Sequence, residues 1–356
     1  MTHVFVAPHP DDVALSCGGL IASLRELGQN VTILTLFSGT GGTRRLTPYQ
    51  REALGFGTKA VWPATEAFNR ATSRRTIRGR VGGPLGGQPR GSRRRRRRRT
   101  PRPRRSGSAR RGIAGRTSTT RPRPASPSWT TAPRKARSDQ ERLDAAAAGE
   151  TMAQRRLEDE RYAAFAEVST VFLDLPDAVF RGYEGDDQLL GTPRADDPPP
   201  VALLRREIAR LEPQRVYFPM GIGGHVDHQL ARNAGIELLA DQPSWIMPFP
   251  SYVGKIVFYE DFPYAHWEDF GRLEDMPADA FAAMPAGVSL QGEFSDVSDV
   301  LERKIRAIAL YESQMDRLFN GVKPMADAVR TYAARVAEIG AVPGGAAERY
   351  WVTTQG

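Results

Sequence analysis

The chain is poor in cysteine and histidine and has no long apolar run, and each shortage excludes a class of protein. Its 356 residues include one cysteine, Cys17, and five histidines. A single cysteine excludes an internal disulfide framework and fits a reducing compartment, which predicts a cytoplasmic protein. No run reaches the roughly 18 apolar residues of a membrane helix, and the first residues lack the pattern of an export signal. We therefore expect no membrane partner.

Acidic residues are absent from one long segment, where the positive charge of the chain gathers. The sequence holds 50 Lys and Arg against 41 Asp and Glu, but residues 70–137 contain 24 of the basic residues and no acidic one. The remainder therefore has 26 basic against 41 acidic side chains, a net charge of −15. This Arg-, Pro- and Gly-rich segment has no apolar periodicity, so we predict that it is disordered. It is either a genuine insertion or an artefact of gene prediction, since a high-GC reading frame that is not under selection translates into long runs of such residues.

Three of the five histidines lie in two short clusters that also carry aspartates. The first cluster follows an apolar run over residues 3–7 and consists of His9, Pro10, Asp11 and Asp12. The second follows another apolar run over residues 215–219 and consists of His225, Val226, Asp227 and His228. Imidazole and carboxylate together suit a borderline divalent ion such as zinc. Taken alone, an Asp-Asp pair is a common turn or helix cap, and a His-x-x-His is ordinary helix surface.

Apolar periodicity along the chain predicts strands that alternate with helices. The expected strands cover residues 3–7, 31–37, 171–175, 215–219 and 255–260. The expected helices cover residues 17–27, 201–211 and 228–240, and a further helix contains residues 141–148 and runs, with a break near Gly149, into residues 151–166. Such alternation predicts an α/β protein with a mostly parallel sheet and helices on both faces. Both histidine clusters then follow the carboxyl ends of strands, where open α/β sheets place their sites.

In this order the two clusters resemble the PIG-L/LmbE family of zinc-dependent N-acetylglucosaminyl deacetylases, whose hallmark is a His-Pro-Asp-Asp loop and a distant His-x-Asp-His. Further stretches similar to family patterns are Arg-Arg-Leu-Glu-Asp at 155–159, residues 172–178, and Lys304 with Tyr-Glu-Ser-Gln at 311–314. The resemblance implies a Rossmann-type, LmbE-like fold. It also implies one deacetylase domain formed by residues 1–69 and 138–356, interrupted by the segment 70–137.

The resemblance implies a role for each polar residue of the two clusters. Three residues would hold Zn²⁺, or another divalent ion such as Fe²⁺: His9, Asp12 and His228. Asp11 would be the general base that takes a proton from the attacking water. His225 would stabilise the tetrahedral intermediate and serve as a proton donor to the leaving amine, and Asp227 would orient one of the imidazoles.

The residues that would surround a substrate carry a weaker signal. Four residues resemble positions that hydrogen-bond sugar hydroxyls in the family: Arg155, Asp177, Arg181 and Asp261. For Asp177, Glu260 and Asp261, the alternative is a solvated loop acid. Phe262, Tyr264 and Trp267 are either an aromatic wall for a sizeable aglycone or part of the core. The chain departs from many family members in having Val13 after the Asp-Asp pair and glycines in place of a tyrosine before the second cluster.

The predicted function is hydrolysis of the N-acetyl group of an N-acetylglucosamine-type glycoside, releasing acetate and a free amine. Two alternatives stay open. One is a zinc amidase of the same fold that cleaves a larger amide. The other is a binder of nucleic acid or another polyanion through residues 70–137, which would act by counterion release without sequence preference. A small glycoside is the expected partner, and nucleic acid is expected only through non-specific binding. The residues do not predict the aglycone or the oligomeric state.

Overall fold

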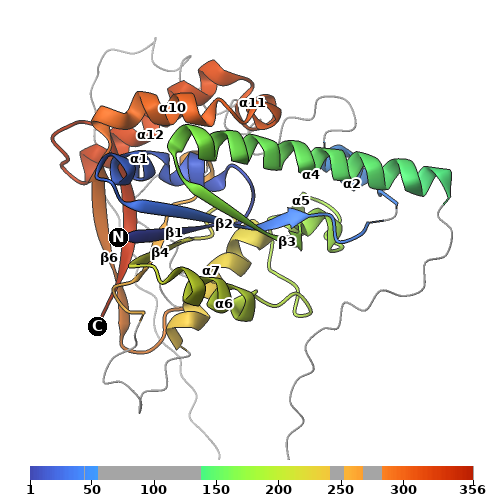
Figure 1. The fold of residues 1–356 in the computed structure, drawn as a ribbon, viewed down its shortest axis with the longest axis horizontal. Helices are drawn as coiled ribbons and strands as arrows, with labels where there is room; N and C mark the ends of the chain where they lie inside the picture. The colour runs from blue at the N-terminus through green and yellow to red at the C-terminus, as the bar shows by residue number, and fades with distance from the viewer. Residues whose placement is uncertain (44, 55–137, 241–251, 268–282, 356) are drawn as a thin grey trace, which may run out of the picture. The chain divides into compact units, whose positions relative to one another are not determined.

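A seven-stranded sheet with helices on both faces forms the centre of the protein in the computed structural model (Figure 1). The structure describes residues 1–43, 45–54, 138–240, 252–267 and 283–355. The predicted disordered segment 70–137 lies outside the described residues. The predicted fold class, α/β with a mostly parallel sheet, is confirmed.

The strands follow the order β3-β2-β1-β4-β5-β7-β6 across the sheet. Their bounds are Thr2–Ala7 (β1), Asn30–Gly39 (β2), Ser169–Pro176 (β3), Arg215–Pro219 (β4), Ile256–Tyr259 (β5), Val288–Asp296 (β6) and Ala347–Gln355 (β7). The first five are parallel to one another and match the five predicted strands. Strand β7 pairs antiparallel with both β5 and β6, and the sequence reading predicted neither β6 nor β7.

Helices cover both faces of this sheet. On one face lie α1 (Asp12–Glu26), α4 (Asp139–Ala166), α10 (Leu301–Ile308), α11 (Glu312–Phe319) and α12 (Val322–Ile339), and on the other α6 (Val201–Leu211) and α7 (Val226–Ala240) (Figure 1). The shorter helices are α2 (Pro48–Ala53), α5 (Asp186–Leu189) and α8 (Tyr264–Trp267), with the 3₁₀ turns η1 (Ala178–Phe180) and η2 (Ser298–Val300). Among the described helices, none is long and apolar enough to cross a bilayer.

Two predicted helices differ from their expected form. Helix α1 begins at Asp12, within the first histidine cluster, instead of at residue 17. Helix α4 begins at Asp139 and continues through Gly149 to Ala166 without the break that the sequence suggested near Gly149. Its first turn is closed by a capping box, in which the side chains of Ser138 and Glu141 accept each other's backbone N–H. Because both orphan donors are satisfied, the helix extends to that point.

Strand β1 lies at the centre of the parallel part of the sheet. Its residues from His3 to Ala7 are buried, because β2 and β4 flank it and helices cover both faces. This explains why the strand reads as a continuous apolar run. The chain runs from β1 to β2 on one side and returns to β4 on the other. The carboxyl ends of β1 and β4 are therefore neighbours at the point where the strand order reverses, which is where open α/β sheets bind ligands.

A buried ion pair holds α1 against the rest of the helical layer. The Lys304 ammonium of α10 lies 2.7 Å from the Glu348 carboxylate of β7. The same carboxylate accepts hydrogen bonds of 2.8 Å from the backbone N–H groups of Gly19 and Leu20 in α1. A Cβ atom on Gly19 would lie 2.7 Å from Glu348 Oε1 and 2.6 Å from Val297 Cγ1. The close approach of β7 to α1 therefore depends on glycine at this position.

We predict opposite effects for alanine at two helical glycines. Gly19→Ala should lower the free energy of unfolding by about 1–3 kcal/mol, because the added methyl overpacks a buried contact. Gly149→Ala is the matched control, since no atom lies within 4 Å of its Cβ position, and it should raise stability by about 0.5–1 kcal/mol. Urea unfolding of both variants measures the effect. Equal stability of the two variants would contradict the packing described for α1.

Candidate metal centre and active site

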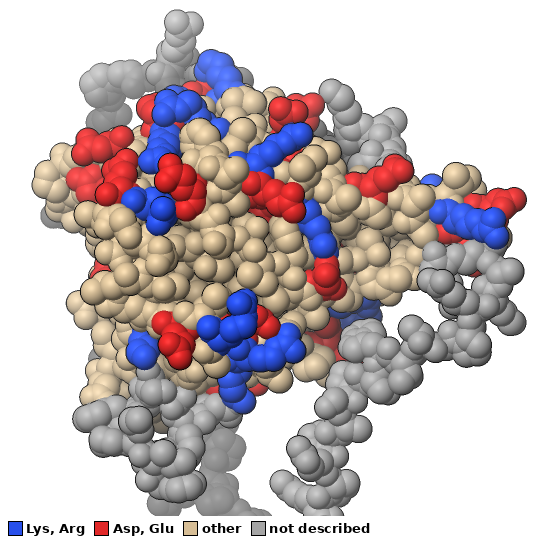
Figure 2. Space-filling model, viewed as in Figure 1, with Lys and Arg blue, Asp and Glu red and all other residues tan. Residues whose placement is uncertain are grey.

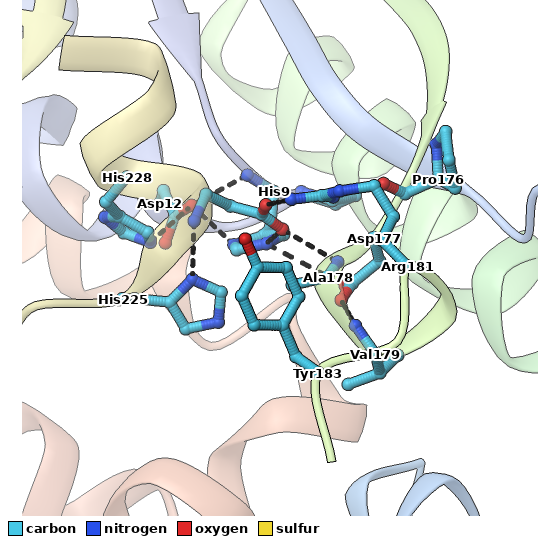
Figure 3. A network of polar contacts seen from close by, with 12 residues as sticks. His9, Asp12, Pro176, Asp177, Ala178, Val179, Arg181, Tyr183, His225 and His228 are labelled. Carbon is cyan, nitrogen blue, oxygen red and sulfur yellow. Dashed lines mark hydrogen bonds and ion pairs between the residues drawn. The ribbon is translucent and has the colours of Figure 1, made fainter. Parts of the chain in front are cut away.

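Four loops bring polar side chains to the carboxyl ends of adjacent parallel strands. His9 follows β1, Asp177 follows β3, and Asp261 follows β5. After β4 come His225 and the first turn of α7 with Asp227 and His228. All these side chains are buried. Figure 3 shows Asp12 between the rings of His9 and His228, with His225 beside them.

The sharp turn between β1 and α1 gives the two aspartates different positions and different contacts. Asp11 is the N-cap of α1, with a backbone φ of 105° and no side-chain capping bond. Asp12 is the first helical residue, and its Oδ2 accepts a 2.7 Å hydrogen bond from the His9 backbone N–H. Neither carboxylate therefore caps the helix, and the cap interpretation of Asp12 is wrong. The turn leaves Asp12 facing the histidines.

Two distances from Asp12 have the length expected between neighbouring ligands of one metal ion. Asp12 Oδ2 lies 3.2 Å from His9 Nδ1 and 3.3 Å from His228 Nε2. In a tetrahedral zinc site with bonds of roughly 2.0–2.1 Å, neighbouring ligand atoms are about 3.3 Å apart. The nitrogens of His9, His225 and His228 also lie within 4.8 Å of one another. The donor set fits a divalent cation.

A second grouping of the same kind exists beside the first. Ligand atoms of His9, Asp177 and Asp227 also lie within 4.8 Å of one another. In this grouping His9 presents Nε2, which is 2.9 Å from Asp227 Oδ2 and 3.8 Å from Asp177 Oδ2. Arg181 occupies the other oxygen of Asp227. Because that carboxylate is already neutralised, the group around Asp12 is the better candidate for the cation.

Two aspartates determine which nitrogen each candidate ligand histidine presents. Asp227 Oδ2 lies 2.9 Å from His9 Nε2, and Asp261 Oδ1 lies 2.7 Å from His228 Nδ1. A carboxylate accepts hydrogen bonds, so each of these imidazole nitrogens carries its proton. Each ring, when neutral, then has its lone pair on the atom that faces Asp12, His9 Nδ1 or His228 Nε2, where a metal ion would take the place of a proton. Carboxylate partners of this kind fix the tautomer and orientation of metal-binding histidines.

The electrostatics of the cluster favour positive charge. Burial opposes an imidazolium at His9, but hydrogen bonds to Asp12 and Asp227 and the charge of Asp177 raise its pKa to about 10. Burial also acts against ionised Asp12, but the charges of His228 and His9 hold its pKa below the usual range. The carboxylates thus stabilise a cation at this point, whether it is a proton or a metal ion.

Asp11 lies beside the cluster in a different environment. Burial raises the pKa of its carboxyl to about 7, although the positive charge of Arg155 opposes the shift. The Arg155 guanidinium is 3.6 Å from Asp11 Oδ1 and 3.6 Å from Asp177 Oδ2. A carboxylate with a pKa near neutrality suits a group that both accepts and returns a proton.

His225 is held neutral and in one tautomer. Burial, with the charge of His9, lowers its pKa well below the ordinary value. Its Nδ1 accepts a 3.2 Å hydrogen bond from the Asp227 backbone N–H, so the proton of the neutral ring is on Nε2. The ring packs edge-on against both His9 and His228, with centroid distances of 4.9 and 5.3 Å. His225 is therefore a hydrogen-bond donor at the edge of the histidine cluster.

Arg181 binds Asp227, the carboxylate that orients His9. Its guanidinium binds both Asp227 and Asp197 and lies over the ring of Phe37, 4.6 Å from the ring centroid. Asp227 also accepts a 3.0 Å hydrogen bond from the Ala178 backbone N–H. Arg181 thus already forms ion pairs with two carboxylates of the protein. Its contacts favour a supporting role over the sugar-binding role that the sequence suggested.

The acidic residues after β5 are not solvated loop acids. Asp261 is 1% exposed, and its second oxygen accepts a 2.9 Å hydrogen bond from the Ile222 backbone N–H. Glu260 is also buried and binds Arg349 and Tyr332. Asp177 is buried too and caps η1 through the Val179 backbone N–H. The alternative of a solvated acid is therefore wrong for all three, and the contacts of Asp261 favour a role in orienting His228.

The aromatic residues after β5 divide between core and site. Phe262 and Trp267 are buried and each packs against Phe319. Tyr264 is partly exposed, and its ring lies edge-on to His228 with a centroid distance of 5.5 Å. The sequence left open whether all three form an aromatic wall for an aglycone or belong to the core. It had no signal to separate Tyr264, because that distinction depends on how α8 packs.

Comparisons with known proteins agree with this geometry. The sequence profile of the PIG-L family, described as GlcNAc-PI de-N-acetylase, matches residues 4–67. A curated relative, the 2'-N-acetylparomamine deacetylase of Streptomyces fradiae, is 29% identical over 180 residues, which cover 49% of this chain and 58% of that protein. The chain therefore matches less than two thirds of the length of this relative. These matches confirm the family resemblance that the two histidine clusters indicate.

Two solved structures of similar fold are described as deacetylases. A triple mutant of the deacetylase Orf2 of the teicoplanin pathway has a TM-score of 0.54 and 19% identity, with coverage of 100% of this chain and 99% of that chain. The A40926 pseudoaglycone deacetylase Dbv21 has a TM-score of 0.53 and 18% identity, and the match covers 99% of this chain and 97% of that chain. At such identity these likenesses establish the fold.

We predict that the two aspartates behind the histidines govern metal affinity. Asp227→Asn and Asp261→Asn should each weaken metal binding by roughly 10- to 100-fold, because the amide no longer fixes the imidazole tautomer. Asp187→Asn, an exposed acid of α5, is the control for the change in charge. Competition with a chromogenic chelator measures the affinities. Unchanged affinity in both variants would show that the histidines need no such support.

Proposed function

From its resemblance to the PIG-L family, we propose that this chain is a metal-dependent N-deacetylase. It hydrolyses the N-acetyl group of an N-acetylglucosamine-type glycoside, releasing acetate and a free amine. The observation that carries the proposal is the spacing of Asp12 Oδ2 from His9 Nδ1 and His228 Nε2, 3.2 and 3.3 Å, beside a carboxyl with a pKa near 7. The spacing suits a divalent ion, and the carboxyl suits a general base.

The proposed catalytic unit comprises residues 1–69 and 138–356, with 70–137 as an insertion. The pairing of β2 with β3 supports it, because these parallel neighbours come from opposite sides of the insertion in the sequence. Helix α4, which follows the insertion, contributes Arg155 to the surroundings of Asp11. The site thus draws on both parts of the chain. The cytoplasm is the proposed compartment, from the low cysteine content.

Zn²⁺ is the proposed metal, held by His9, Asp12 and His228. Two neutral imidazoles and one carboxylate leave a divalent ion with a net charge near +1. Three protein ligands also leave a coordination position open to a small molecule. When bound, the ion supplies Lewis acidity that polarises a carbonyl and makes water more acidic. Fe²⁺ would accept the same ligands.

Asp11 and His225 carry the proposed proton and charge chemistry. Asp11 accepts a proton from water as the water attacks the acetamide carbonyl, and it returns that proton to the leaving amine. His225 donates a hydrogen bond from Nε2 to the carbonyl oxygen as that oxygen gains negative charge. Since burial lowers the pKa of His225, this neutral donor is a better description than the proton donor that the sequence suggested.

Arg155 and Asp177 are the proposed contacts to the sugar. Both lie at the edge of the metal centre, and their side chains are 3.6 Å apart at their closest. The Nε atom of Arg155 is buried and has no hydrogen-bond partner among the described residues. A sugar hydroxyl would instead meet the exposed part of the Arg155 side chain, which is 15% of its surface. We expect Arg181 and Asp261 to act indirectly, through Asp227 and His228.

We predict that each proposed ligand is essential for metal binding. His9→Ala, Asp12→Ala and His228→Ala should each purify without stoichiometric zinc, because two remaining ligands compete poorly with water. His3→Gln changes a buried histidine of β1 outside the site and should keep the metal. Elemental analysis decides the outcome. Full zinc content in all three alanine variants would refute the ligand assignment.

We predict a different result for the proposed general base. Asp11→Asn should keep the metal but lower kcat by roughly 10²- to 10⁴-fold, because the amide is nearly isosteric and accepts no proton. Acetate release and zinc content are measured on the same preparation. Loss of zinc in this variant would instead make Asp11 a ligand.

The function itself is tested with a panel of substrates. Purified, zinc-loaded protein should release acetate from N-acetylglucosaminyl glycosides faster than it releases longer acids from matched N-acyl analogues. The reverse preference would favour the alternative, an amidase for a larger amide. No acid release from any amide, together with salt-dependent binding of DNA that vanishes when residues 70–137 are deleted, would favour the polyanion binder.

A further inference from the structure

Helix α4 holds a single peptide group of the active-site turn at both of its polar ends. The turn peptide is the one between Pro10 and Asp11. Its carbonyl oxygen, on Pro10, accepts a 3.3 Å hydrogen bond from Arg155 Nη2. Its N–H, on Asp11, is close enough to the carboxylate of Asp159 to act against the rise in pKa that burial causes at that carboxyl. Arg155 and Asp159 are four residues apart, so both face the turn from the same side of α4.

The turn needs such support because of its backbone conformation. Asp11 has φ 105° and ψ −36°, a region that side chains other than glycine rarely adopt. Conformations of this kind persist only where the surrounding structure holds them in place. The carboxyl of Asp11 leaves the chain at that strained Cα atom, so the orientation of the peptide decides where the carboxyl points.

Asp159 is itself fixed by two other elements. Its Oδ1 accepts a 2.6 Å hydrogen bond from the Tyr311 hydroxyl, just before α11. Its Oδ2 accepts a 3.1 Å hydrogen bond from the Thr35 hydroxyl of β2. The residue is 2% exposed. A buried carboxylate that receives hydroxyl donors from two other parts of the chain has one orientation, in which it lies beside the Asp11 N–H.

We propose that Asp159 is a positioning residue that, together with Arg155, clamps the Pro10–Asp11 peptide and thereby aims the Asp11 carboxylate. The role in catalysis rests on the proposed function, in which Asp11 is the general base. The clamp also explains why the stretches 155–159 and 311–314 both occur in this chain, since the structure joins them at Asp159.

The neighbouring residue Glu158 offers a matched control. It is fully buried and accepts hydrogen bonds of 2.9 and 2.6 Å from the backbone N–H and hydroxyl of Ser313. Glu158 thus links α4 to α11, as Asp159 does, but among the described residues it forms no hydrogen bond with the active-site turn. Loss of either carboxylate loosens the same two helices. Only loss of Asp159 releases the turn.

The first test is structural and needs no substrate. Amide hydrogen exchange of zinc-loaded protein is followed at Asp11 in the wild type, Asp159→Leu and Glu158→Leu. We expect slow exchange in the wild type and in Glu158→Leu, and exchange at least tenfold faster in Asp159→Leu. Asp159→Ser, whose side chain is too short to reach the turn, replaces the leucine variant if that one fails to fold. Unchanged protection in the Asp159 variant would overturn the clamp.

The second test asks whether Asp159 acts through Asp11. Asp159→Leu should lower kcat by roughly 10- to 100-fold, the scale for a displaced catalytic group, with KM changed less than threefold and zinc retained. Glu158→Leu should keep kcat within threefold. In an Asp11→Asn background, Asp159→Leu should cost less than a further threefold, because the group it aims is already gone.

The outcomes separate the two proposals. A full additional loss in the double variant, or an equal loss in Glu158→Leu, would show that Asp159 acts by general stability and would overturn its positioning role. If wild-type protein cleaves no amide, the proposed function fails, while the exchange rate at Asp11 still decides whether the clamp exists.

Discussion

The architecture of the site depends on the hydrogen bond between Asp227 and His9. It joins the two histidine clusters, 218 residues apart in the sequence, at a distance of 2.9 Å. The contact exists because β1 and β4 are adjacent parallel strands, so their carboxyl ends meet. It directs His9 Nδ1 toward Asp12, and Arg181 balances the charge of the Asp227 carboxylate. Removing the strand pairing would separate the ligands, and removing Arg181 would leave a buried anion without its partner.

Much of the fold could be predicted from the sequence, because the parallel strands are buried on both faces and read as short apolar runs. Strands β6 and β7 could not be recognised in this way. Strand β6 is a sheet edge on which partly buried and exposed residues nearly alternate, and β7 includes the polar residues Glu348 and Arg349. Those two residues are buried because Lys304 and Glu260 come from distant elements to pair with them. Such partners appear only once the chain has folded.

The candidate site was predictable in its residue types and not in its contacts. Two clusters of histidine and aspartate after apolar runs were enough to indicate a metal centre. The sequence could not show that Asp261 faces His228, that Arg181 faces Asp227, or that Asp159 lies beside the Asp11 N–H. Each of these depends on the order of strands in the sheet or on a positive φ in a turn. An acid or arginine beside a site therefore reads from sequence as a substrate contact, even where it supports another side chain.

We propose that one divalent ion binds between His9, Asp12 and His228. Anomalous X-ray diffraction at the zinc edge, from crystals grown with zinc, locates such an ion. We expect one strong peak about 2.0–2.2 Å from His9 Nδ1, Asp12 Oδ2 and His228 Nε2. A peak among His9, Asp177 and Asp227, or no peak at the histidine cluster, would contradict it.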